Sequence, residues 1–127
     1  PLARNTPTVI NSGLQVGNFA DLRTTYLEDQ VTDVIENVDE MHGSLGTIAA
    51  RLAADAALSA QFRTAFAGEP ARGDTVVTAA RIRTALAAYQ RSLSRLNSPV
   101  DRALRGEMAA LSDEERLGFN VFVGKGK

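Results

Sequence analysis

The sequence contains no cysteine and no tryptophan and has one histidine, and these absences narrow the chemistry that it can carry. Without cysteine there is no disulfide, no thiol nucleophile and no thiolate metal site, and the redox compartment cannot be inferred from cysteine usage. A Ser-His-Asp hydrolase triad is poorly supported, because the serines fall mostly at predicted helix starts. His42, which stands beside Gly43 between two predicted helices, is better explained as a solvated loop residue than as a metal ligand.

Charge of one sign and long apolar runs are also lacking. The formal net charge is −1, with acidic and basic residues interspersed, so we expect neither a nucleic-acid partner nor binding to an anionic membrane. No stretch approaches the roughly 20 apolar residues that span a bilayer, and no secretory signal pattern opens the chain. The chain lacks an initiating Met and ends on Gly-Lys-Gly-Lys directly after an apolar helical pattern, which suggests a piece of a longer protein.

What the sequence does contain is helical periodicity. Its 127 residues, 44% of them hydrophobic, suit one compact domain. Residues 1–23 include proline and glycine without a sustained period and predict an extended, ordered loop, and no later segment resembles a strand. The sequence therefore predicts an all-α fold, a small irregular domain of about six helices. These helices are expected from Thr25 to about Asn37, from Ser44 through Ala53, from Asp55 to Gly68, from Asp74 through Leu96, from Pro99 through Leu104, and onward from Ser112.

Four of these helices have a recognisable N-cap, a residue whose side chain accepts a hydrogen bond from the first turn. Ser44 and Asp55 precede apolar stripes, and Ser98 is followed by a proline at the first helical position. Ser112 and Glu115 have the spacing of a capping box. In the longest predicted helix, the apolar residues that hold the helical period are Val76, Ala79, Ile82, Leu86, Tyr89, Leu93 and Leu96.

Two polar features deserve a functional reading beside a structural one. An acidic stretch runs along and beyond the first predicted helix, and spacing alone favours a solvated helix side and exit loop for it. Gln30 lies at the edge of the apolar stripe of that helix, so its amide needs a hydrogen-bonding partner, although a purely structural role is the commoner explanation. The acidic residues are Asp29, Asp33, Glu36, Asp39 and Glu40.

A series of short motifs covers nearly the whole chain, and in order and spacing it resembles the bacterial di-haem cytochrome c peroxidases and the related methylamine-utilisation di-haem proteins. Each motif is weak by itself, and the resemblance depends on the series. The matching residues are Arg4-Asn5-Thr6-Pro7-Thr8, Asn11, Phe19, Asp21, Arg23, Leu27-Glu28-Asp29-Gln30, Asn37 with Glu40-Met41-His42, Phe62-Arg63, Ala65-Phe66, Ala85 to Tyr89, Ser98-Pro99, Asp101, and Gly118 through Gly124-Lys125-Gly126.

The resemblance implies a periplasmic enzyme with a cytochrome c-like parent fold that reduces hydrogen peroxide to water at one haem. Electrons would come from a small cytochrome c or cupredoxin through a second haem. In the family both Cys-x-x-Cys-His attachment motifs would lie outside residues 1–127, so neither haem can attach covalently here. Residues 1–23 would then be the tail of the first haem domain and residues 112–127 the start of the second. The resemblance leaves the oligomeric state open and is compatible with a homodimer.

The resemblance also assigns roles to three residues. Glu40 matches the acidic residue that overhangs the peroxide-binding haem, where it would act as the general acid/base and move a proton between the peroxide oxygens. Gln30 matches the neighbouring glutamine, which would order water or peroxide. Asn5 matches a residue that helps to bind a calcium ion between the haem domains, a role that suits its hard oxygen donor.

Three positions depart from the family pattern. The family usually has Trp-Asp-Gly-Arg after the phenylalanine, whereas this chain has Ala20 at the tryptophan position and Leu22 at the glycine position. Val38 replaces a frequent proline in the loop that holds Glu40. Ala20 leaves room for a relative that oxidises an organic or protein substrate. The alternative from another class is a non-enzymatic helical module that packs against a partner protein.

Overall fold

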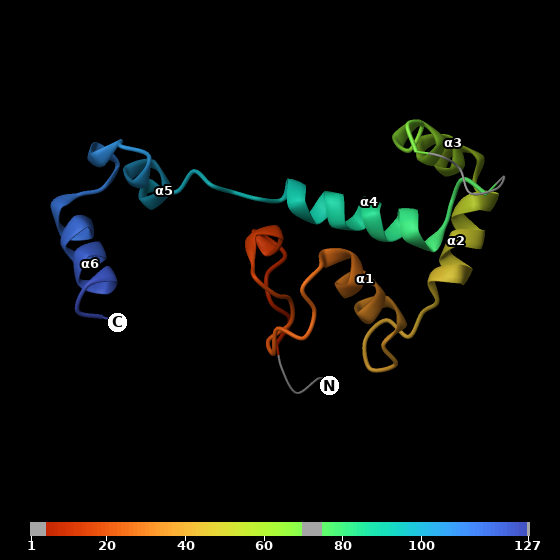
Figure 1. Cartoon of the computed structure of the whole chain (residues 1–127), viewed down its shortest axis with the longest axis horizontal. Coiled ribbons are helices and arrows are strands. Elements are labelled where there is room, and N and C mark those ends of the chain that lie inside the picture. Colours follow the sequence, from red (N-terminus) through yellow and green to blue (C-terminus); the bar gives the residue numbers. More distant parts are fainter. Residues whose placement is uncertain (1–4, 70–74, 127) are drawn as a thin grey trace. The chain divides into compact units, whose positions relative to one another are not determined.

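The computed structural model describes residues 5–69 and 75–126, and the elements that it contains are helical (Figure 1). The described residues hold no strand beyond an isolated bridge between Asn18 and Thr24, so the all-α prediction is confirmed. Within these residues no helix is both long and apolar enough to cross a membrane. The elements are η1 (Ser12–Leu14), α1 (Leu27–Glu36), α2 (Leu45–Ala54), α3 (Ala56–Ala65), α4 (Ala79–Ser92), α5 (Pro99–Leu104), η2 (Met108–Ala110) and α6 (Asp113–Val123), where η marks a short 3₁₀ helix.

The chain divides into two compact units, and the boundary lies between Ser94 and Arg95. Unit 1 contains η1 and α1 to α4, and unit 2 contains α5, η2 and α6. Sequence length had suggested one compact domain. The assignment of residues 1–23 and 112–127 to two haem domains stays a prediction.

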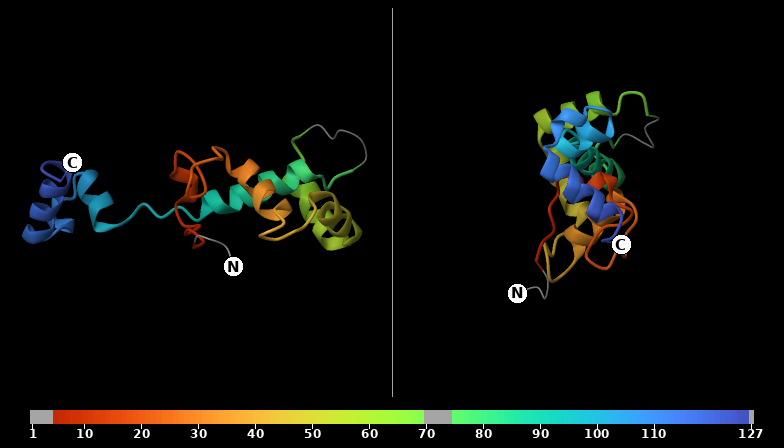
Figure 2. Two further views of the ribbon diagram at one scale, coloured as in Figure 1. Left: turned by 90° about the horizontal axis from the view of Figure 1, so that it is seen from below. Right: turned by 90° about the vertical axis from the view of Figure 1, so that its left-hand side faces the viewer.

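The core of unit 1 is built where α1, α2 and α4 meet (Figures 1 and 2). It consists of buried aliphatic side chains, and Phe62 from α3 packs against its edge. Since a helix in water is stabilised mainly by packing its apolar face, this small cluster is what holds the three helices together. The buried members are Val31, Ile35, Leu45, Val77 and Ile82.

The four predicted N-caps are confirmed. Ser44 Oγ accepts from the backbone amide of Thr47 at 3.3 Å, and Asp55 Oδ1 accepts from that of Leu58 at 2.9 Å. The capping box at Ser112 has both of its hydrogen bonds, and Ser98 forms a second capping box with Asp101. These helix starts follow from the sequence because each cap bonds to a backbone amide three residues away.

The predicted extent of α4 is wrong at its C-terminal end, and the helix begins later than predicted. It starts at Ala79, where the Thr78 side chain caps it, and Asp74 lies outside the described residues. It ends at Ser92, whose hydroxyl donates to the carbonyl of Tyr89 at 2.6 Å. Such a local side-chain bond competes with the helical pattern. Leu96, predicted as the last residue of the stripe, is instead exposed and outside the helix.

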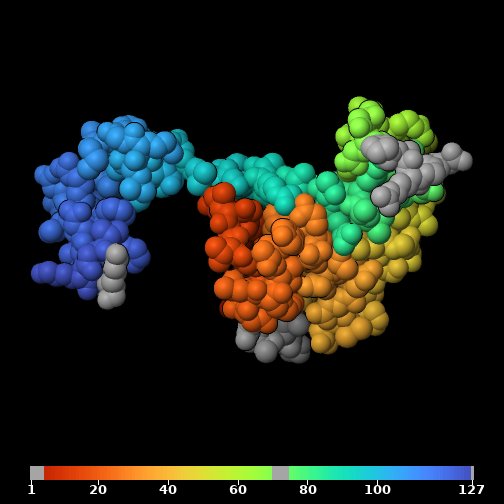
Figure 3. Space-filling view, in the orientation of Figure 1, coloured from red at the N-terminus to blue at the C-terminus, as the bar shows by residue number. Residues whose placement is uncertain are grey.

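The predicted apolar stripe of α4 is confirmed at Ile82, which is buried in the core with Val31 and Ile35 of α1, but not at Leu86 and Tyr89 farther along the helix. Ala87 is fully buried at 0% exposure, whereas Leu86 is 41% and Tyr89 63% exposed. The residues one turn on either side of Ala87 bond to α1 and η1: Gln90 Oε1 accepts from Ser12 Oγ, and Arg83 approaches Asp29. Figure 3 shows the N-terminal loop lying directly against α4. Around Ala87 the contact is therefore made by small and polar side chains, which aliphatic periodicity could not reveal.

In unit 2 the buried apolar residues are few, Ala103 and Leu111. The last helix forms as predicted, but its apolar residues Leu117, Val121 and Phe122 are exposed. A cavity of about 150 Å³ with mainly apolar walls lies between α5, η2 and α6. Among the described residues, unit 2 thus has a small core beside a large exposed apolar surface.

Candidate functional site

The loop that follows α1 is closed against the C-terminal end of that helix. The Asn37 carbonyl accepts from the backbone amides of Glu40 at 3.1 Å and His42 at 2.9 Å, and the Ile35 carbonyl accepts from Gly43 at 2.7 Å. These bonds use carbonyl groups that the end of a helix leaves without helical partners. His42 adopts a left-handed conformation with φ 47° at the turn. The loop is therefore a defined structure that can hold a side chain in place.

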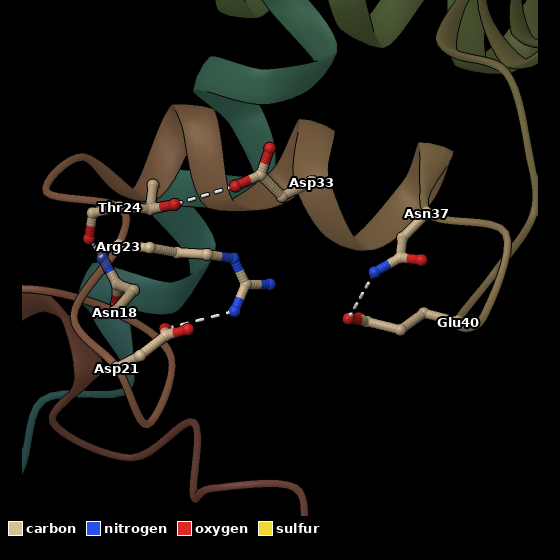
Figure 4. A network of polar contacts seen from close by, with 7 residues as sticks. All are labelled: Asn18, Asp21, Arg23, Thr24, Asp33, Asn37 and Glu40. Carbon is tan, nitrogen blue, oxygen red and sulfur yellow. Dashed lines mark hydrogen bonds and ion pairs between the residues drawn. The ribbon is translucent and has the colours of Figure 1, made fainter. Parts of the chain in front are cut away.

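Glu40 is half-buried in this loop, and Asn37 holds its carboxylate (Figure 4). Asn37 Nδ2 donates to Glu40 Oε1 at 3.1 Å. The other end of the same amide is also engaged, because Asn37 Oδ1 accepts from the backbone amide of Asp39 at 2.9 Å. The carboxylate is thus oriented by a neutral donor rather than by a cation.

Gln30 lies on α1 with its amide oxygen buried. Among the described residues, Gln30 Oε1 has no hydrogen-bonding partner, and Arg83 Nε on α4 is in the same situation. A buried acceptor without a partner is uncommon in folded proteins and calls for an explanation, such as water or a ligand at the position. The sequence-based expectation that this amide lies at the edge of a buried surface is consistent with the structure.

A tight turn leads into α1 and carries the residues around Ala20. The turn is closed at its base by the bridge between Asn18 and Thr24, and Thr24 Oγ1 donates to Asp33 Oδ2 at 2.8 Å. The Arg23 guanidinium lies 3.4 Å from the centre of the Phe19 ring and 3.2 Å from the Asp21 carboxylate. In Figure 4, Arg23 and Glu40 are on the same side of α1.

The structure does not bring all of the predicted site residues into contact with one another. Within the described part of the chain no hydrogen bond links Glu40 to Gln30, and Asn5 is exposed. No cluster of three or more histidine, cysteine, aspartate or glutamate side chains that could hold a metal occurs among the residues the structure describes. His42 is exposed, as predicted.

Four residues of the acidic stretch, Asp29, Asp33, Glu36 and Asp39, are exposed as the spacing predicted, although three of these carboxylates also have partners. Asp33 accepts from Thr24, and Glu36 Oε1 accepts from the Leu45 backbone amide at 3.2 Å, which tethers the start of α2. Asp29 lies 3.8 Å from Arg83. Glu40 differs from these because its partner comes from its own loop.

Sequence reasoning missed Asn37 as part of the site. A signal was present, because asparagine just after a helix commonly bonds to backbone groups two residues ahead, as Asn37 does with Asp39. Nothing local predicted that the second end of its amide would reach Glu40.

The chain is thus a small all-helical protein segment, and the polar groups of its candidate site are carboxylates and amides. Residues 1–109 match the family model of the di-haem cytochrome c peroxidases. The chain belongs to the di-haem cytochrome c peroxidase family, which confirms the resemblance read from its motifs.

Individual relatives agree with this family. The chain is 36% identical to the methylamine utilization protein MauG of Methylophilus methylotrophus over 125 residues, which cover 98% of this chain and 36% of that protein. It is 35% identical to the cytochrome c551 peroxidase of Nitrosomonas europaea, covering 96% of this chain and 35% of that protein. The corresponding peroxidase of Pseudomonas aeruginosa is 31% identical, with 97% and 34% covered. The chain thus spans about a third of the length of the relatives that it matches.

The family name implies haem, and a c-type haem requires particular residues in the protein that holds it. Covalent attachment needs thioether bonds from cysteine, and an axial ligand is commonly histidine. The sequence offers no cysteine, and His42 is exposed on a loop. These residues therefore do not fit the role of holding a c-type haem. Half-buried Glu40 and the buried amide oxygen of Gln30 fit groups that act beside one.

Proposed function

We propose that this chain is the segment between the two haem-attachment motifs of a periplasmic di-haem cytochrome c peroxidase. The whole protein would reduce hydrogen peroxide to water with electrons from a small cytochrome c or cupredoxin. Family membership and the names of the relatives support this proposal. The observation that carries it is the half-buried carboxylate of Glu40, held by Asn37 at a motif position of the family.

In this proposal Glu40 is the general acid/base. Cleavage of the oxygen–oxygen bond requires that a proton leave one peroxide oxygen and that the departing oxygen receive one. Glu40 can do both in turn, because one carboxylate oxygen is oriented by Asn37 and the other makes no hydrogen bond within the described residues. A group positioned in this way typically contributes about 10²- to 10⁴-fold to the rate.

Gln30 is proposed to order water or peroxide beside Glu40. Its amide is neutral, so it can accept a hydrogen bond without competing for the transferred proton. The buried amide oxygen without a protein partner supports this role.

The cofactors of the proposed whole protein are two covalent haems and a calcium ion. Haem supplies the iron that binds peroxide and the route for electrons, and its attachment residues would lie outside residues 1–127. Asn5 is proposed to give one oxygen ligand to calcium, with the other ligands outside this chain. The chain alone is accordingly proposed to be inactive.

The proposal is tested by Glu40→Gln in the complete haem-loaded protein. We expect peroxide turnover to fall by about two to four powers of ten. Haem content, measured from the absorption spectrum, should not change. Asp39→Asn is the matched control, because it removes the neighbouring exposed carboxylate and keeps its backbone amide, and it should change turnover by less than about twofold. Unchanged turnover in Glu40→Gln would remove Glu40 from the mechanism.

A second function within the family has support from one observation. Two of the relatives are methylamine utilization proteins, each 36% identical to this chain. Ala20, at the usual tryptophan position, is compatible with a protein that passes electrons by a different route. In that case the whole protein would oxidise an organic or protein substrate, and peroxide turnover with a cytochrome donor would be slow in the wild type.

A further inference from the structure

We propose that Asn37 is the positioning residue for Glu40, with a donor role that is separable from its role in shaping the loop. This inference rests on the proposed function, because it gives Asn37 a part in the proton transfer assigned to Glu40. The observation behind it is that the two ends of one amide have two different tasks. Asn37 Oδ1 accepts from the Asp39 backbone amide at 2.9 Å, and Asn37 Nδ2 donates to Glu40 Oε1 at 3.1 Å.

The side-chain amide of Asn37 cannot flip, exchanging its oxygen and nitrogen, without losing both hydrogen bonds. Carboxylate oxygens only accept, and a backbone amide only donates, so the oxygen of Asn37 must face Asp39 and its nitrogen must face Glu40. The main-chain carbonyl of Asn37 is occupied as well, by the amides of Glu40 and His42. The loop therefore fixes the orientation of the amide, and the amide in turn fixes one oxygen of Glu40.

The Nδ2 group is not needed to form the turn. The turn uses Asn37 Oδ1, the Asn37 carbonyl and the carbonyls of Val34 and Ile35, all of them acceptors for backbone amides. Within the part of the chain that the structure describes, the hydrogen bond to Glu40 is the one contact of Asn37 that reaches a chemically active side chain. An amide donor restricts the carboxylate to one orientation while adding no opposite charge, unlike the Arg91 guanidinium that pairs with Glu28.

Asn37→Asp separates these two tasks. The new side chain is nearly the same size and keeps an acceptor for the Asp39 amide, but it places a carboxylate oxygen where the donor was. Glu40 should then turn away from its position. Since misplacing a reacting group by about 1 Å can cost roughly 10²-fold in rate, we expect kcat/KM for peroxide to fall by about ten- to a hundredfold in the complete haem-loaded protein.

Comparison of the two substrates shows whether the loss is specific. Proton transfer belongs to the peroxide step, so kcat/KM for the reduced electron donor should stay within about twofold of the wild type. Val38→Asp serves as the charge control, because Val38 is 66% exposed and the same negative charge is added one residue along the loop. We expect kcat/KM for peroxide in Val38→Asp to fall by less than about threefold. Equal losses for both substrates in Asn37→Asp would overturn the proposal by showing general damage.

A measurement of stability tests the hydrogen bond without any activity. In the complete haem-loaded protein, Asn37→Asp should lower the thermal unfolding midpoint by about 2–4 °C, because two carboxylates then face each other. The double variant Asn37→Asp/Glu40→Gln exchanges donor and acceptor, so its pair can form again and its midpoint should return toward that of Glu40→Gln. A double variant that is as unstable as Asn37→Asp would overturn the proposed contact.

Failure of this inference differs from failure of the proposed function. If Glu40→Gln loses peroxide turnover and Asn37→Asp keeps it, Glu40 acts without Asn37 and the inference is wrong. If Glu40→Gln itself keeps turnover, the function proposed for Glu40 is wrong, whatever Asn37 does to stability.

Discussion

Four non-glycine residues of the described chain have a positive φ, and all four lie in the segments that flank or follow α1: Asn11, Phe19, Leu22 and His42. L-amino acids lose about 1–2 kcal/mol in this region, and asparagine tolerates it best. Leu22, with φ 54°, stands where the family pattern usually has glycine. The departure noticed in the sequence therefore has a structural consequence, since the turn keeps a glycine-like conformation without glycine.

At the residue scale we predict that Leu22→Gly stabilises the chain by about 0.5–1 kcal/mol, after allowing for the backbone entropy that glycine loses on folding. Little burial is lost, because Leu22 is 57% exposed. Urea unfolding of the chain measures the change. Leu22→Ala is the matched control, because it shortens the side chain and keeps the strained φ. If Leu22→Ala is more stable than Leu22→Gly, backbone strain does not dominate the stability at this position.

At the scale of elements, α1 and α4 are joined at their oppositely charged ends. The two terminal nitrogens of the Arg91 guanidinium, in the last turn of α4, donate to the carboxylate of Glu28, in the first turn of α1, at 2.8 and 3.0 Å. Each side chain also has the sign that its helix end favours: the negative Glu28 lies at the partly positive start of α1, and the positive Arg91 at the partly negative end of α4. The Arg91 hydrogen bonds lower the pKa of Glu28 below its ordinary value, against the opposing effect of burial.

This pair predicts a pH dependence of stability. A carboxyl group whose pKa is lower in the folded than in the unfolded state stabilises the fold above its unfolded pKa, and the stabilisation disappears as the pH falls through the folded pKa. Between about pH 5 and pH 3 the wild type should therefore lose more stability than Glu28→Gln. At pH 7 we expect Glu28→Gln to be less stable by at most about 1 kcal/mol, because the pair is partly exposed. Chemical unfolding over this pH range provides the measurement.

The control for this prediction is Asp39→Asn, which removes an exposed carboxylate that makes no ion pair among the described residues. Its loss of stability on acidification should follow that of the wild type. Parallel curves for the wild type and Glu28→Gln would contradict the contribution of the Glu28–Arg91 pair.

At the scale of the whole molecule, the two units are supported by very different amounts of buried apolar surface. Unit 1 has a core shared by three helices, and the N-terminal loop is joined to it through Ser12 and Thr24. In unit 2, α6 has no buried residue among those described. Large exposed apolar surfaces usually mark a contact with other protein, which is what the proposed segment of a larger enzyme would make.

Hydrogen exchange of the isolated chain distinguishes this proposal from a self-sufficient interaction module. The peroxidase proposal predicts weak protection in residues 1–23 and 112–127, because the haem domains to which they belong are missing. Amides of α1 and α4 provide the protected reference. Strong protection throughout residues 1–23 in a monomer, confirmed by light scattering, would favour the non-enzymatic module.

The sequence by itself determined which segments form α-helices and where four of them begin, because a cap and its target amide are three residues apart, but it did not reveal the short 3₁₀ helices η1 and η2. It also identified the family, because the motif series is a property of the chain alone. Only the tertiary structure decided that Ala87 rather than Leu86 faces inward, that Arg91 meets Glu28, and that Asn37 holds Glu40. The first two are contacts between distant segments, and the third depends on a loop folding back on the carbonyls of α1. Such contacts depend on packing and on backbone direction, which a periodic pattern does not specify.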